Sequence, residues 1–199
     1  MSEAKSQRSG LSRIVYDHLV RPFVESEAPI THISWGAAIG MFVGMTPLVG
    51  IQMYTVTVIW TICRYLLRVR FNLPIAVAMV WVTNPITVIP IYYAFLVTGN
   101  LSLGMDFAQS FAFDEFRDLF SQAQEETATG PANWLYIKIA LLFWTFGWPM
   151  VVGSLIWAVP LSVLTYPFTT FAMLKYRALI AQREGMTYAQ WKKAHIHPE

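Results

Sequence analysis

The stretch WGAAIGMFVGMTPLVGIQ, residues 35–52, decides the fold. It carries no charge, and three of its glycines are spaced by four: Gly36, Gly40 and Gly44. Glycines at this spacing share one helix face and allow a second helix to approach closely. Pro47 and Gly50 then end the helix, because proline lacks the backbone N–H donor and glycine can adopt backbone conformations that other residues avoid. The stretch predicts a close-packing apolar helix that stops abruptly.

The glycine face has two interpretations. It packs the protein's own helices, which we favour because a chain with several spans has internal partners. Alternatively, it drives self-association into a homo-oligomer or contact with a membrane-protein partner.

The composition indicates a membrane solvent. Of 199 residues, 55% are hydrophobic and 13% are charged, whereas a soluble domain carries about 25% charge. Three runs contain no Asp, Glu, Lys or Arg: residues 28–63, 71–105 and 139–174. Each run exceeds the ~20 residues that a helix needs to cross the hydrocarbon core. The fold class expected is an all-α, polytopic helical membrane protein whose helices are broken by proline and glycine.

The positive charges predict the topology. Lysines and arginines precede the first run, and Arg64, Arg68 and Arg70 follow it, so both of its ends are expected in the cytosol. Helices over residues 31–46 and 51–67 then form either a re-entrant hairpin or two short spans, and both remain open.

The domain organisation follows from the same runs. Residues 1–30 are a cytosolic lead-in with an amphipathic helix, and residues 175–199 are a cytosolic tail. The membrane domain covers residues 31–174 and comprises apolar runs at 31–67, 74–98 and 135–174, with a polar loop at 99–134. In the last run we expect interruptions at Gly147, Gly153, Pro160 and Pro167.

A second break is predicted at Asn84 and Pro85, where asparagine caps and proline begins a new helix that is kinked again at Pro90. Backbone groups at a break must be paired or reach water. Gln52 and Asn84 therefore have two interpretations. Their side chains either hydrogen-bond a substrate headgroup or pair with the unpaired backbone groups of the two breaks. We slightly favour the second. The candidate substrate-binding residues lie at the two breaks: Pro47, Gly50, Gln52, Asn84 and Pro85.

Catalysis and metal binding find little support in the sequence. Residues 28–63, 71–105 and 139–174 hold no charged side chain, and no nucleotide-binding or nucleophile-elbow motif occurs. His32 lies at the edge of a run, where an interfacial role is more common than general-base chemistry. His195 and His197 are too few for a metal site. We therefore expect no enzyme activity, no metal and no cofactor.

One combination of motifs resembles a known family. Gly36-x-x-x-Gly40-x-Phe42-x-Gly44-x-x-Pro47-x-x-Gly50-x-Gln52 is followed by Asn72-x-Pro74 and then by Asn84-Pro85. This pattern resembles the bacterial membrane family called domain of unknown function 2062. The resemblance implies a protein of the bacterial inner membrane, and the apolar runs predict that it is multi-pass. It implies no activity, so no catalytic or binding residue is carried over.

The functional hypothesis is a non-enzymatic inner-membrane protein that binds or translocates an anionic lipid or lipid-linked amphiphile at the two helix breaks. The alternative is a structural or assembly partner in an envelope complex. Membrane lipids are the expected partners in the first case, and the sequence gives no indication of a nucleic-acid partner.

Overall fold

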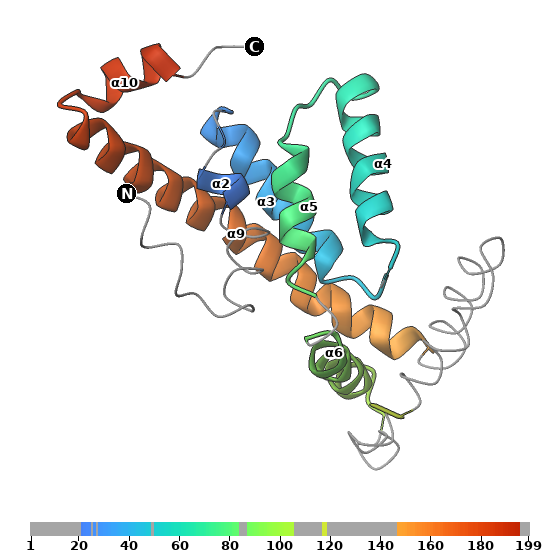
Figure 1. Cartoon of the computed structure of the whole chain (residues 1–199). Coiled ribbons are helices and arrows are strands. Elements are labelled where there is room, and N and C mark those ends of the chain that lie inside the picture. The colour runs from blue at the N-terminus through green and yellow to red at the C-terminus, as the bar shows by residue number, and fades with distance from the viewer. Residues whose placement is uncertain are drawn as a thin grey trace.

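The computed structural model describes residues 21–24, 26, 28–48, 50–83, 87–105, 117–118 and 147–195. Within these ranges every regular element is a helix (Figure 1), so the all-α class is confirmed there. The helices are α2 (Arg21–Val24), α3 (Ile30–Gly44), α4 (Gln52–Tyr65), α5 (Leu73–Val80), α6 (Val88–Ser102), α9 (Gly147–Arg183) and α10 (Tyr188–His195).

The quoted stretch forms α3, a turn and the start of α4. The α3 helix ends at Gly44, and Gly50 adopts φ 82°, a left-handed conformation that glycine takes without steric cost. The chain then reverses, so that α4 runs antiparallel to α3 (Figure 1). Both helices lie within two residues of their predicted ends. Pro29 precedes α3, and no side chain caps the start of the helix.

The glycine face of α3 lies against α5. A Cβ built at Gly36 would meet the Asn72 carbonyl, and one at Gly40 would meet Ala76. The third glycine, Gly44, faces Val80 in the same way. The partner residue is 36 positions further along the chain each time, so α3 and α5 run parallel at close range.

The second break separates α5 from α6. Asn72 caps α5, since its side chain accepts a hydrogen bond from the Ile75 amide at 3.1 Å. The helix start predicted at Pro85 falls on residues that the structure does not describe, and the described helix α6 begins at Val88. Pro90 consequently lies in the first turn of α6, where proline is tolerated, and the interior kink expected there does not arise. Asn84 and Pro85 themselves lie outside the described residues.

The longest element corrects the prediction of a broken third run. The α9 helix continues through Gly153, Pro160 and Pro167 for 37 residues, which is about 55 Å at 1.5 Å per residue. It is long and apolar enough to cross a membrane, and among the described residues it alone passes that test.

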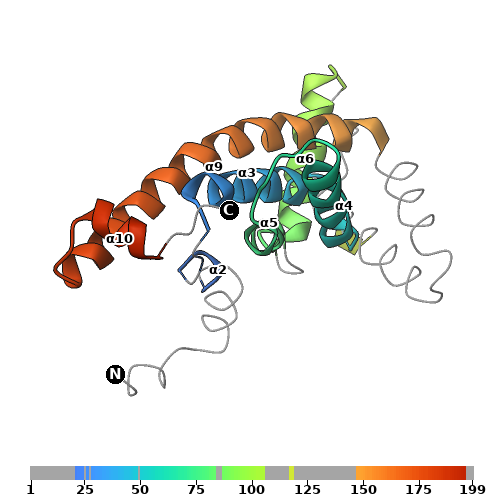
Figure 2. The same cartoon turned by 90° about the horizontal axis from the view of Figure 1, so that it is seen from above.

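Side-chain contacts explain why α9 persists across its prolines. The Ser34 and Thr170 hydroxyls lie 2.8 Å apart, and the Ser162 hydroxyl donates to the Ala38 carbonyl at 2.9 Å. Packing along α3 therefore holds the helix on both sides of Pro167, where a backbone hydrogen bond is lost. Figure 2 shows that α3 lies beside α9 along the whole length of α3.

The α6 helix crosses the first part of α9 at two glycines. A Cβ at Gly99 would collide with the Pro149 carbonyl, and one at Gly153 would collide with the Phe95 carbonyl. Nearby, the Trp157 indole donates to the Thr98 hydroxyl at 3.0 Å. The two backbones touch at this crossing, so only glycine fits at these positions.

A glycine turn and a capped short helix follow α9. Gly185 adopts φ 71° after α9, and Thr187 caps α10 through reciprocal hydrogen bonds with Gln190. Trp191 is buried against Ala181, which fixes α10 to the end of α9. Because α9 passes without interruption through residue 174, the predicted boundary between membrane domain and tail falls inside one helix.

Several predictions fall largely outside the described residues. They concern the amphipathic helix of the lead-in before residue 21, most of the polar loop at 99–134 and the start of the third run. Within the loop, the structure describes Arg117 and Asp118, whose side chains form an ion pair at 3.2 Å.

Candidate functional site

The two predicted breaks lie side by side. The Thr83 hydroxyl, at the described edge of the second break, is 2.9 Å from the Gly44 carbonyl oxygen and 3.1 Å from Gln52 Oε1. The end of α3 and the start of α4 thus contact the end of α5. Of the other predicted site residues, Pro47 is half-buried and Gly50 is exposed, while Asn84 and Pro85 are not described.

Gln52 closes the first break. Its side chain is buried, and Nε2 donates to the carbonyl oxygens of Gly44 and Thr46, each at 3.2 Å. The Tyr92 hydroxyl donates to the same Thr46 carbonyl at 3.1 Å. These donors satisfy carbonyls that the end of α3 leaves without helical partners. The geometry therefore favours the structural interpretation of Gln52 over the ligand-binding one.

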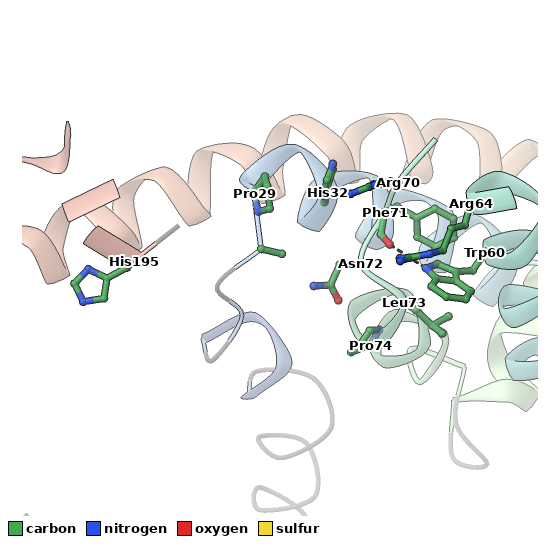
Figure 3. Close-up of a pocket in the computed structure, with 11 residues that line it drawn as sticks. Pro29, His32, Trp60, Arg64, Arg70, Phe71, Asn72, Leu73, Pro74 and His195 are labelled. Carbon is green, nitrogen blue, oxygen red and sulfur yellow. Dashed lines mark hydrogen bonds between the residues drawn. The ribbon is translucent and has the colours of Figure 1, made fainter. Parts of the chain in front are cut away.

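A cavity of about 480 Å³ lies at the opposite end of α3 and α5. We call it the cationic pocket (Figure 3), and four parts of the chain line it. These are the start of α3, the end of α4, the connector leading into α5 and the tip of α10. Its lining residues are Ala28, Pro29, His32, Trp60, Arg64, Arg70, Phe71, Asn72, Leu73, Pro74 and His195.

Asn72 joins the walls of the pocket. Its backbone amide donates to the His32 carbonyl at 3.0 Å, and Nδ2 donates to the Ser26 hydroxyl at 3.1 Å. Its Oδ1 caps α5 as described above. One residue therefore fixes the starts of α3 and α5 next to each other, and both helices direct their positive dipole ends toward the pocket.

The end of α4 supplies an aromatic wall. The Trp60 indole donates to the Phe71 carbonyl at 3.2 Å, and the Arg64 guanidinium carbon lies 5.2 Å from the centre of the Trp60 ring. This cation–π contact orients Arg64 over the ring. The connector then turns at Arg68, whose φ is 55°, and returns the chain to the pocket at Arg70.

The charged side chains among the described lining residues of the pocket have one sign. Among the described residues that line it, Arg64 and Arg70 are cationic, His32 and His195 are imidazoles, and none is acidic. Arginines and two helix starts together attract an anion with several oxygen acceptors, such as a phosphate. Trp60, Phe71 and Leu73 add apolar surface, so the pocket suits a group that is anionic at one part and apolar at another.

Arg177, near the end of α9, binds the segment that forms one wall of the pocket. It is 2% exposed, and Nη2 donates to the carbonyl oxygens of Ser26 and Ala28 at 2.9 and 2.7 Å. Ala28 lines the pocket, so the end of α9 holds the pocket wall in place. The sequence had suggested for Arg177 only a cytosolic positive charge.

Sequence reasoning missed the pocket because no local motif marks it. In the sequence, Arg64 and Arg70 indicate only which end of the first run is cytosolic, and His32 indicates an interfacial residue. What brings them together is the parallel packing of α3 on α5, a contact between segments 36 residues apart. The described residues contain no group of three His, Cys, Asp or Glu side chains placed to hold a metal.

Comparison with models of protein families gives a match over most of the chain. The model of a family described as "Uncharacterized protein conserved in bacteria (DUF2062)" matches residues 12–181. This confirms the resemblance that the glycine and proline motifs suggested. No curated protein and no solved structure matches the chain. The matched residues include the pocket-lining parts of α3, α4 and α5 and end before α10.

Proposed function

The chain belongs to DUF2062, a family of uncharacterized bacterial proteins, and on that premise we propose that it binds the anionic headgroup of a lipid or lipid-linked amphiphile in the cationic pocket. The proposal places it in the bacterial inner membrane as a non-enzymatic, multi-pass protein. The observation that carries it is the convergence of Arg64, Arg70 and two helix starts on one cavity.

The outer surface supports a membrane location. Large apolar side chains on α9 face outward, among them Val163, Leu164 and Phe168, which are 65, 63 and 74% exposed. On α4, Tyr54 and Val58 are exposed in the same way. Exposing these large apolar side chains to water is unfavourable, whereas the acyl chains of a membrane can cover them.

The position of the pocket supports a headgroup as its ligand. Arg64, Arg68 and Arg70 follow the first apolar run, and positive residues there favour the cytosolic face. The pocket then opens at the level where phosphate headgroups meet the inner leaflet. A cavity of about 480 Å³ lies in the range typical for small-molecule ligands.

The alternative function, a structural or assembly partner, has weaker support. It rested on the glycine face of α3, and that face contacts α5 within the same chain. The outward apolar face of α4 is compatible with a protein partner, but lipid covers such a face equally well.

Binding of a matched series of compounds tests the proposal. The purified full chain in neutral detergent should bind dioctanoylglycerol phosphate clearly more tightly than either dioctanoylglycerol or inorganic phosphate. Arg64→Ala should weaken binding of the phospholipid by about tenfold, because one charge-assisted contact is lost. Microscale thermophoresis measures all three affinities.

Two variants serve as controls for this measurement. Arg183→Ala removes an exposed charge near the end of α9, outside the pocket lining, and should leave the affinity unchanged. Gln52→Ala changes the helix break instead of the pocket. If folded Gln52→Ala lost binding while Arg64→Ala kept it, the ligand would belong at the breaks and the pocket proposal would fail.

A further inference from the structure

The α10 helix lies beyond the residues that the family model matches, yet its tip reaches the cationic pocket. We propose that α10 is a specificity element: His195 gives the pocket a second basic end, so the preferred ligand carries two separated anionic groups on its headgroup. This inference rests on the proposed function and goes beyond it by stating what distinguishes the preferred headgroup.

The position of His195 is well defined. Its ring stacks on Trp191 with centroids 4.8 Å apart and planes 15° from parallel, and Nδ1 lies 3.1 Å from the Trp191 carbonyl oxygen. When Nδ1 donates to that carbonyl, Nε2 is the nitrogen left for a ligand. In the imidazolium form Nε2 carries a proton, which it donates to an anionic oxygen.

The helix that carries His195 is itself anchored. Trp191 is 8% exposed, packs against Ala181, and has the Arg177 guanidinium carbon 5.9 Å from its ring centre. The same Arg177 binds the Ser26 and Ala28 carbonyls beside the pocket. The end of α9 thus connects α10 with the pocket wall, which makes His195 a fixed part of the lining.

The layout of the pocket separates two basic ends. Figure 3 shows His195 at one end and Arg64 with Arg70 at the other, with Pro29 and His32 between them. A headgroup with one phosphate contacts one end. A headgroup whose second phosphate is separated from the first by a short polyol contacts both, and each added charge-assisted contact strengthens binding.

Two dioctanoyl lipids that differ by one phosphate test the inference. We take phosphatidylinositol and phosphatidylinositol 4-phosphate as probes of charge spacing and measure their affinities for the full chain in neutral detergent. The wild-type chain should bind the doubly charged lipid about tenfold more tightly, the effect of one charge-assisted contact. His195→Ala should reduce this ratio to about one while changing the affinity for phosphatidylinositol less than about twofold.

Further variants separate a change in the ligand from a change in the fold. Arg64→Ala should weaken the binding of both lipids. His195→Lys should restore the preference for the doubly charged lipid, because lysine provides a cationic hydrogen-bond donor again. An unchanged preference in folded, full-length His195→Ala would overturn the role of α10.

The outcomes also distinguish this inference from the proposed function. Suppose that the wild-type chain bound both lipids equally and that Arg64→Ala abolished the binding of both. Headgroup binding in the cationic pocket would then be supported, and the role of α10 in specificity would be refuted. If the wild-type chain bound neither lipid, nor dioctanoylglycerol phosphate, both proposals would fail.

Discussion

Gly40→Ala is expected to destabilise the protein by about 3 kcal/mol, the upper end of the cost of overpacking a tight contact. A Cβ at this position would lie 2.8 Å from Ala76 Cα and 2.8 Å from Met79 Cβ, and closer still to the Ala76 carbonyl oxygen. Because two of these atoms belong to the backbone, relief requires α3 and α5 to move apart. Thermal unfolding in detergent, followed by helical circular dichroism, measures the loss.

Gly44→Ala is the matched control, since it lies on the same face of the same helix. Its Cβ would be 3.3 Å from Val80 Cα, a tight contact that a small shift accommodates. We expect it to destabilise the protein by less than about 1 kcal/mol. Equal losses for the two variants would mean that the glycine face does not pack on α5 as described.

Arg177→Met is the second variant with a large expected effect. Methionine keeps much of the apolar stem but removes the guanidinium that binds the Ser26 and Ala28 carbonyls. Hydrogen bonds from a charged donor contribute about 1.5–3 kcal/mol each, so we expect a loss of about 3 kcal/mol or more. The segment before α3 and the end of α9 should then separate, and limited proteolysis should cut the chain before Pro29.

Arg183→Met provides the comparison for this variant. Arg183 is the last residue of the same helix and is exposed, so its replacement should leave both unfolding and proteolysis unchanged. Wild-type stability in Arg177→Met would show that the buried guanidinium does not hold the pocket wall.

Much of the first half of the fold was predictable because local signals are strong there. The spacing of the glycines predicted a close helix contact, and Pro47 with Gly50 predicted the reversal between α3 and α4. Each of these signals acts within a few residues, where steric and hydrogen-bonding rules dominate.

The errors arose where tertiary contacts override a local rule. Pro160 and Pro167 each remove a helix hydrogen bond, and the sequence does not reveal that Ser162 and Thr170 bond to α3 beside them. The interior kink expected at Pro90 is absent for a local reason, because α6 begins at Val88 and Pro90 lies in its first turn.

The candidate site was the least predictable part. Gln52 was recognised as a polar residue at a break, but its three partners come from two segments and determine its structural role. The cationic pocket requires the ends of α3, α4, α5 and α10 to meet. Arginines near a helix end look the same in sequence whether they face a headgroup in bulk lipid or a shared cavity.

Photo-crosslinking tests the central claim, that the cationic pocket holds an anionic headgroup, most directly. The probe is a short-chain phosphatidate with a diazirine close to the glycerol, bound to the full chain in detergent. We expect labelled peptides from residues 28–32 and 60–74, and we expect excess dioctanoylglycerol phosphate to suppress the labelling. Specific labelling at residues 44–52 and 83, with none around the pocket, would contradict the account and return the ligand to the helix breaks.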